Sequence, residues 1–400
     1  MDYFTKLPNE ILIEIFECCR LLPLTLVCQK FAEVIGNSPA LMKKVILVIS
    51  EKISVPNLLN AERKYIAVYF KFNYKIKTDC LKLFHKFNGI KSLEFTRCII
   101  QADLFLKILE VLPDLESLSI YSTFLSNKSD LEQFEPPQMM RLNRLSLRNS
   151  EETFLEYLYN SSLKSLYIGF SSRYSTKTIE NFLQTQSKVK VIEYLSVPSF
   201  DDSLMKVILQ DMKNLEKLHL ACDKIDMNLV GNLNLTNYSV KSLNLYGNFP
   251  NACDINIILN FFKNLLNLEI EMNNMLEPAN ILQMPSSLQS LSIAHCSGDY
   301  FNAISIRNLK KLQLTDANFT AEEWSRFASR NPAIEFIAIK DESTSNEIFT
   351  GICLNFPFLN RFEISYDPER LTPDIQDFIS SENFPQNIKT LKLTQRNNNS

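Results

Sequence analysis

The chain contains 400 residues, of which 46% are hydrophobic and 22% are charged. This composition predicts a folded chain with a large buried core and excludes disorder along its whole length. The formal net charge of −3 gives no electrostatic basis for binding nucleic acid or a membrane surface, so we expect the partners to be proteins.

The N-terminus lacks the features of a targeting or membrane segment. No run approaches the roughly 18 uninterrupted apolar residues that a membrane-spanning helix needs. Asp2, Glu10 and Glu14 stand where a signal peptide would have a basic start and then an uncharged stretch. The nine cysteines are odd in number and scattered, which favours reduced thiols over a disulfide framework. These features predict a cytoplasmic or nuclear protein.

Residues 1–47 differ in pattern from the rest of the chain and predict a separate helical domain. Pro8 suits the first turn of a helix. The apolar residues after it recur at helical spacing and form one broad face, Ile11, Leu12, Ile15, Phe16 and Cys19. A second apolar helix is predicted through Leu24, Val27, Cys28, Phe31 and Ile35. A domain this small should pack against the rest of the chain, against another protein, or against both.

Residues 48–89 are predicted to join this helical domain to the repeats that follow. Val45–Ile49 and Tyr65–Phe72 are apolar and rich in β-branched or aromatic residues, so we expect them to be the first strands of a sheet. Ile66 opens a first, irregular repeat in this interpretation.

From residue 90 to residue 395 one short pattern recurs, in which apolar residues are separated by two free positions and then by one. The central apolar residues of thirteen copies are at positions 93, 118, 145, 166, 192, 218, 243, 268, 291, 312, 337, 362 and 391, which are 21 to 29 residues apart. This steady spacing indicates repeated structural units in which each short strand turns alternate side chains into a core. Apolar residues at helical spacing predict helices over 202–212, 254–262, 321–329 and 346–355.

These repeats resemble leucine-rich repeats, and the resemblance covers roughly residues 90–395. It implies an α/β solenoid, with a curved parallel sheet and outer helices, preceded by the small helical domain and followed by a polar tail at 396–400. The family pattern adds Asn or Cys three residues after the last apolar residue of each strand, and the matches or small polar substitutes are Cys98, Thr123, Ser150, Asp223, Asn248, Asn273 and Cys296. We expect these residues, and Trp324, to have packing roles.

Within residues 1–47, the segments Leu7–Ile11, Ile15–Phe16, Val27–Phe31 and Leu41–Met42 resemble an F-box. In that family the Leu-Pro start and the Val-Cys helix dock on the Skp adaptor, which hangs from a cullin scaffold whose RING subunit recruits the ubiquitin-conjugating enzyme. F-box proteins with leucine-rich repeats hold their substrates on the repeats, and the same order is found here. The resemblance implies an adaptor-binding surface formed by Leu7, Pro8, Ile11, Leu24, Val27 and Cys28.

Signals of enzymatic chemistry are weak. With only seven glycines, the chain has no glycine-rich loop for a phosphate and no strand that leads into a nucleophile-elbow motif. Its three histidines, His85, His219 and His295, are too dispersed for a zinc site. We therefore predict no catalytic activity, cofactor or metal.

Together these features predict the substrate receptor of an SCF-type ubiquitin ligase, an adaptor whose partners are the Skp adaptor, through it the cullin and RING subunits, and an unidentified protein substrate. The alternative is a ubiquitin-independent scaffold in which residues 1–47 only cap the exposed end of the repeat core. An extracellular repeat receptor is a third hypothesis, opposed by the lack of a signal peptide and of paired cysteines.

The strand residues between the recurring apolar ones point away from the core. On successive strands they should form one continuous surface, since neighbouring strands lie about 4.8 Å apart. Interfaces favour Tyr and Arg as anchors. The predicted substrate-binding residues are Tyr121, Arg148, Tyr167, His219 and Tyr246. Glu269 and Glu271 border this patch. The alternatives are that these are ordinary solvated residues, or that the site lies in the C-terminal repeats around Lys340, Arg361 and Lys392.

Overall fold

The computed structural model of the chain divides into two compact units, Met1–Val189 (unit 1) and Lys190–Ser400 (unit 2). The structure describes residues 7–17, 29–42, 45–50, 59, 65–71, 75–127, 136–169, 175–197, 201–222, 233–247, 252–272, 283–295, 301, 304–316, 319–340, 345–366 and 373–395.

Unit 1 begins with three short helices, α2 (Asn9–Glu17), α4 (Gln29–Asn37) and α5 (Pro39–Met42), which we call the helical unit. They share a small core of Leu12, Phe16, Phe31, Val34, Ile35, Leu41 and Val45. The rings of Phe16 and Phe31 meet edge to face, with centroids 5.0 Å apart. The predicted first helix is confirmed, and the second is confirmed from Gln29 onward, because residues 18–28 lie outside the described residues.

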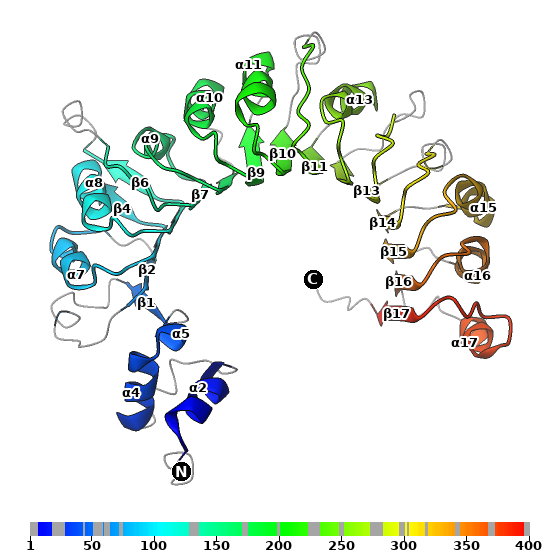
Figure 1. The fold of residues 1–400 in the computed structure, drawn as a ribbon, viewed down its shortest axis with the longest axis horizontal. Helices are drawn as coiled ribbons and strands as arrows, with labels where there is room; N and C mark the ends of the chain where they lie inside the picture. The colour runs from blue at the N-terminus through cyan, green and yellow to red at the C-terminus, as the bar shows by residue number, and fades with distance from the viewer. Residues whose placement is uncertain are drawn as a thin grey trace. The chain divides into compact units, whose positions relative to one another are not determined.

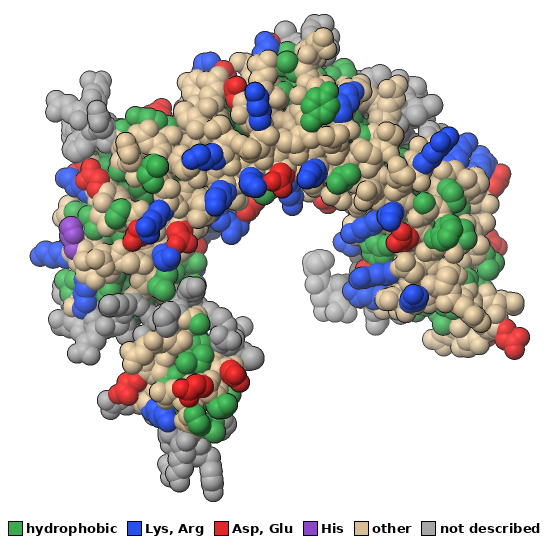
Figure 2. Space-filling model, viewed as in Figure 1, with side chains coloured by type: hydrophobic (Ala, Val, Ile, Leu, Met, Phe, Trp, Pro, Cys, Tyr) green, Lys and Arg blue, Asp and Glu red, His purple; other side chains and the backbone are tan. Residues whose placement is uncertain are grey.

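The apolar face of α2 is narrower than predicted. Leu12 and Phe16 are buried, but the side chain of Ile11 is 42% exposed. Figure 2 shows hydrophobic and acidic side chains side by side on the surface of the helical unit. The helical unit also contacts the start of the repeats, since Tyr65 and Ile66 pack against its core.

The remainder of unit 1 is a parallel sheet with helices along one face (Figure 1). Its strands pair in chain order, β1 (Ile46–Ile49), β2 (Ala67–Lys71), β3 (Ser92–Thr96), β5 (Ser117–Tyr121), β7 (Arg144–Arg148) and β8 (Ser165–Gly169). Its helices are α7 (Cys80–Lys86), α8 (Ala102–Val111), α9 (Thr153–Glu156) and α10 (Thr176–Thr185). Both strands predicted for the junction are therefore confirmed. A second, two-stranded parallel sheet of β4 (Ile99–Gln101) and β6 (Phe124–Ser126) was not predicted.

Unit 2 repeats the same arrangement. Its strands are β9 (Val191–Val197), β10 (Lys217–Cys222), β11 (Ser242–Gly247), β12 (Asn267–Met272), β13 (Ser290–Ala294), β14 (Lys311–Thr315), β15 (Phe336–Lys340), β16 (Arg361–Tyr366) and β17 (Thr390–Gln395). Its helical segments are α11 (Asp202–Lys206), the π-helix η2 (Val207–Asp211), α13 (Ala252–Asn260), α15 (Ala321–Arg330), α16 (Asn346–Asn355) and α17 (Pro373–Ser380). All thirteen predicted strand copies coincide with strands, so the leucine-rich-repeat solenoid is confirmed as the architecture within each unit.

The core of each unit lies between the sheet and its helices. The central apolar residues of neighbouring strands are register partners, as Leu218, Leu243 and Leu268 show in unit 2. Alternate residues along a strand point to opposite sides, so these side chains are buried while their neighbours are at least partly exposed. Trp324 packs in this core among four phenylalanine rings, as predicted, and is 2% exposed.

The start of most strands is held in register by a backbone carbonyl that accepts two hydrogen bonds. In unit 1, the carbonyl of Lys91 accepts the N–H groups of Glu116 and Ser117, both at 2.9 Å. In unit 2, the carbonyl of Lys241 accepts those of Leu266 and Asn267 in the same way. The same pair of bonds recurs from repeat to repeat and sets the point at which each new strand joins the sheet.

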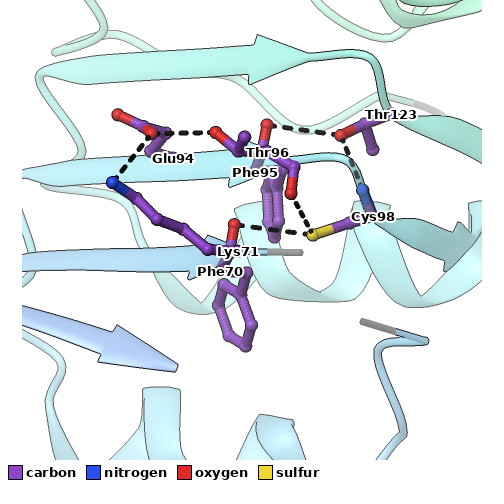
Figure 3. Close-up of polar contacts among 7 residues, drawn as sticks. All are labelled: Phe70, Lys71, Glu94, Phe95, Thr96, Cys98 and Thr123. Atoms are coloured by element: carbon purple, nitrogen blue, oxygen red, sulfur yellow. Dashed lines mark hydrogen bonds and ion pairs between the residues drawn. The ribbon is translucent and has the colours of Figure 1, made fainter. Parts of the chain in front are cut away.

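Buried polar side chains hold the opposite ends of the strands in unit 1 (Figure 3). The hydroxyl of Thr123 accepts the N–H of Cys98 at 3.3 Å and can donate its single proton to the carbonyl of Phe95 or of Tyr121. Ser150 occupies the same place one repeat later, where its Oγ accepts the N–H of Thr123 at 3.2 Å. Cys98 Sγ lies within hydrogen-bond distance of two backbone carbonyls, that of Phe70 in the repeat before and that of Thr96 in its own repeat.

These contacts form a ladder of hydrogen bonds, which we call the turn ladder, through Cys98, Thr123 and Ser150. The expectation that these residues have structural roles is confirmed for all three. The residue before each rung, Arg97, Ser122 or Asn149, has a positive φ near 50°. The other predicted turn residues, Asp223, Asn248, Asn273 and Cys296, lie outside the described residues.

The register of β11 predicts opposite responses at its two faces. Leu243 is fully buried, so Leu243→Asp should destabilise unit 2 by about 4 kcal/mol or more, because it buries an unpaired charge. Tyr246 points to the other face, and Tyr246→Ala should cost roughly 0.5 kcal/mol. Urea unfolding followed by circular dichroism measures both values. Equal losses would show that the assigned faces are wrong.

The turn ladder predicts a second stability effect. Thr123→Val keeps the side-chain shape but leaves the Cys98 N–H without its acceptor, which should cost about 1–3 kcal/mol. Thr96→Val is the matched control, because the Thr96 hydroxyl donates to the half-exposed Glu94 and its loss should cost less than about 0.5 kcal/mol. Similar unfolding midpoints for the two variants would contradict a stabilising role for the turn ladder.

Candidate interaction surfaces

Each unit presents a sheet face that none of the described helices covers, which we call the helix-free face (Figure 1). The alternate strand positions that point away from the core form this face. In unit 1 it includes Tyr121, Arg148 and Tyr167, and in unit 2 it includes His219 and Tyr246. The five predicted substrate-binding residues therefore all lie at helix-free positions, three in unit 1 and two in unit 2.

In unit 1, Arg148 and Tyr167 form a stacked pair. The guanidinium carbon of Arg148 lies 4.0 Å from the centre of the Tyr167 ring, and its Nε donates to Ser146 Oγ at 3.4 Å. Tyr121 is the register partner of Arg148 on the adjacent strand. The cation–π contact holds Arg148 in a fixed position, as an interface anchor requires.

Gly169 makes this stacked arrangement possible. This glycine was not identified from the sequence as part of the surface. Gly169 is the register partner of Arg148, and the ring of Tyr167 lies against its backbone. A Cβ atom at position 169 would lie 2.5 Å from Cε1 of Tyr167, so only glycine allows the ring to occupy this place. A glycine at an outward strand position is the sequence signal that could have indicated a close approach.

Elsewhere on the helix-free face of unit 1, on β3, Glu94 is at the centre of a polar cluster that we also did not predict (Figure 3). Its Oε1 accepts the Thr96 hydroxyl at 2.9 Å and lies 3.9 Å from Lys71 Nζ. Burial raises the pKa of Tyr69, and the nearby negative charge of Glu94 raises it further. The Glu94 carboxylate already contacts Thr96 and Lys71 within the cluster. We therefore expect the cluster to contribute to the shape of this face more than to charge pairing with a partner.

In unit 2, His219 lies beside an irregularity of β9. The register pairs Ile192 with Leu218 and Leu195 with Leu220, so Glu193 and Tyr194 together stand opposite His219 alone. A regular repeat centred on Ile192 would turn Tyr194 inward, but the structure places Leu195 there, fully buried. The extra residue forms a β-bulge, which the regular repeat could not predict.

The bulge brings the ring of Tyr194 to His219, with centroids 4.9 Å apart. His219 Nε2 is buried and has no hydrogen-bond partner among the described residues. Burial lowers the pKa of His219 below its ordinary value, and the positive charge of Lys217 lowers it further. His219 is therefore a neutral, partly desolvated ring at neutral pH.

Tyr246, the other predicted residue of unit 2, is two strand positions beyond Asn244 and has Ala221 and Glu271 as register partners.

The predicted adaptor surface is only partly described. Pro8 is exposed and Ile11 is 42% exposed, whereas Leu7 is half-buried and packs against the helical core. The Leu7 carbonyl also accepts a hydrogen bond from Lys30 Nζ at 2.9 Å. Leu7 thus has a structural role that its assignment to an open binding surface did not include. The remaining predicted residues, Leu24, Val27 and Cys28, lie outside the described residues.

Groups suited to chemistry are sparse in the part of the chain that the structure describes. Cys80, Cys98 and Cys353 are buried and form no disulfide, and burial raises the pKa of Cys353 to about 12. Within the same residues, no group of three or more His, Cys, Asp or Glu side chains could hold a metal ion. None of the described helices is long and apolar enough to cross a membrane.

The comparisons with known proteins return similar solved structures, three of which have low sequence identity to this chain. No protein-family model matches the chain, and no curated protein matches it. A leucine-rich-repeat protein of Leptospira interrogans is 12% identical over 90% of this chain and 91% of its own, with a TM-score of 0.46. The internalin InlF of Listeria monocytogenes is 12% identical over 78% and 77% of the two chains, with a TM-score of 0.36. TLR13, in its complex with ssRNA13, is 14% identical over 89% of this chain and 57% of its own, with a TM-score of 0.48. At these values the likenesses support no conclusion about function.

The lowered pKa of His219 predicts a pH dependence of stability. As the pH falls below about 6.5, the unfolded chain binds a proton at His219 before the folded chain does, so the folded state loses stability with falling pH. His219→Gln should reduce the drop in melting temperature between about pH 7.5 and about pH 5.5. At about pH 8, where the imidazole is neutral in both states, any difference between the variants reflects packing alone. Parallel pH curves for the two proteins would contradict the prediction.

Proposed function

We propose that this chain is a protein-binding scaffold that serves as the substrate receptor of an SCF-type ubiquitin ligase. In this proposal the helical unit docks on the Skp adaptor, which links the chain to the cullin and RING subunits. The leucine-rich repeats hold the protein substrate on their helix-free face, and the chemistry of ubiquitin transfer belongs to the associated subunits. Such a receptor works in the cytoplasm or the nucleus.

The observation that chiefly supports the adaptor role is the separate core of the helical unit. Its buried residues come from α2, α4 and α5 together with Val45, and among the described residues near the sheet Tyr65 and Ile66 pack against them. At the same time Pro8 and Ile11 are exposed at the start of α2. These are positions at which the sequence resembles the F-box, so an apolar surface is available where that family binds its adaptor.

The repeats support the other half of the proposal. The helix-free face presents side chains such as the stacked Arg148 and Tyr167, which contact each other in the unbound chain. Preordered aromatic and arginine side chains lose little conformational entropy on association, which is why they are common anchors at protein interfaces.

A second candidate function is a scaffold that is independent of ubiquitin, with the helical unit acting only as a cap. The contacts of Tyr65 and Ile66 with the helical core favour it, because a terminal repeat must cover its apolar edge. The two functions differ in one measurable property, the binding of the Skp adaptor.

The adaptor role predicts that Ile11→Arg lowers capture of the Skp adaptor by the full-length chain by about tenfold or more. Ile11 is chosen over Leu7 because it is exposed and outside the helical core, so the change should leave folding intact. Quantitative co-purification measures the effect.

The matched control is Glu10→Arg, which places the same side chain on an exposed position of α2 that points in another direction. Capture by this control should stay within about twofold of wild type, since an exposed charge away from the contact has little effect. Absence of the adaptor from wild-type preparations would favour the cap function, and equal capture by both variants would remove Ile11 from the adaptor surface.

A further inference from the structure

The helix-free face of β14–β17 contains an aromatic ring between two cations. Lys311, Phe336 and Arg361 are register partners on three successive strands. Lys311 Nζ lies 5.2 Å from the centre of the Phe336 ring, and the guanidinium carbon of Arg361 lies 5.1 Å from it. Both cations can interact with the π-system of the ring, which positions their charges on this face.

Glu363 is the acidic residue at the centre of this cluster. It accepts a hydrogen bond from Arg361 Nε at 2.9 Å. This hydrogen bond is the main cause of a lowered pKa at Glu363, opposed by burial and reinforced by the charges of Arg361, Lys392 and Lys311. Three cations therefore converge on one carboxylate, which cannot neutralise all of them.

Lys340 adds a fourth cation on the same face. Lys340 and Lys392 are exposed, and neither belongs to an ion pair among the described residues. We call this group of four cations with Phe336 and Glu363 the cationic strip. At the outward positions of β14–β17, four positive charges stand against one negative charge, a net charge of +3, although the chain as a whole has a net charge of −3.

The acidic side chains of unit 2 are separated from the cationic strip along the same sheet. Glu269 and Glu271 occupy the outward positions of β12, two strands before β14. Figure 2 shows Lys and Arg side chains gathered over the C-terminal strands. A long polyanion that followed the face would meet the two glutamates, so this distribution favours a short acidic ligand over a nucleic acid.

We propose that the cationic strip binds a short, extended segment of a partner protein that is rich in Asp and Glu. Neighbouring strands are about 4.8 Å apart and alternate residues of an extended chain are about 6.8 Å apart, so carboxylates on alternate residues can reach successive cations of the strip. Ala338, between Phe336 and Lys340, leaves room for the backbone of the segment. The methylene groups of the Asp and Glu side chains in the segment contact the half-buried Phe336 ring.

This inference rests on the protein-binding role proposed for the repeats, and it names the chemistry of the bound protein. It does not depend on adaptor docking, because the cationic strip lies in unit 2 and the helical unit in unit 1. The two proposals can therefore fail separately.

The test uses the full-length chain and a fluorescein-labelled 12-residue peptide of alternating Glu and Ser, with binding followed by fluorescence anisotropy. The double variant Lys340→Glu, Lys392→Glu should weaken binding by about tenfold or more, because it replaces two attractions with two repulsions. It leaves Phe336, Arg361 and Glu363 unchanged. The control variant Lys217→Glu, Lys241→Glu makes the same change in charge at exposed positions of unit 2 outside the strip, and should change binding by less than about threefold.

Binding of the wild-type chain should also weaken as salt is raised from about 50 to about 200 mM, as expected for exposed charges. Equal losses in the strip and control variants, or no loss in either, would overturn the proposal. Stronger competition by a single-stranded RNA of equal charge than by unlabelled peptide would also overturn it, in favour of a nucleic-acid ligand. Unchanged capture of the Skp adaptor by the strip variant, together with peptide binding by Ile11→Arg, would assign the two activities to separate surfaces.

Discussion

The register between each strand and the next determines which side chains face the core and which face a partner. At the strand starts one carbonyl accepts two N–H groups from the following repeat, and in unit 1 the hydroxyls of Thr123 and Ser150 tie the strand ends. Since side chains alternate along a strand, a shift of one residue would exchange the buried and exposed sets. Each repeat contacts mainly its two neighbours, so these local bonds are repeated at every step instead of being gathered in one central core.

The fold could be predicted from the sequence where spacing and alternation agree. Leu218, Leu243 and Leu268 recur every 25 residues, and each is buried at the centre of a strand. The strand at β9 was predicted, but its register after Ile192 was not, because Tyr194 and Leu195 are both apolar and the pattern cannot tell which one faces the core once a residue is inserted. The short β4 and β6 strands were missed because three residues are too few to give a periodic signal.

The candidate surfaces could be predicted by residue type but not by their contacts. Outward positions follow from alternation, so Arg148 and Tyr167 were expected on the helix-free face. Their stacking depends on Gly169, which is the partner of Arg148 only once the strands are in register. The cationic strip likewise requires residues about 25 positions apart in sequence to become neighbours, and Glu363 acquires its role only through them. The partial burial of Leu7 depends on the packing of three helices, which the F-box resemblance does not specify.

The bulge in β9 has a consequence for how such a chain can change during evolution. Between Ile192 and Leu195 the strand contains one residue more than its neighbour, yet the pairing is regular again at Leu220 and continues through Cys222. An insertion is thus absorbed within a single strand, and the repeats that follow keep their places. The added side chain goes to the helix-free face, where Glu193 and Tyr194 replace a single residue. New binding specificity can therefore arise by lengthening one strand, without any compensating substitution in the buried leucines.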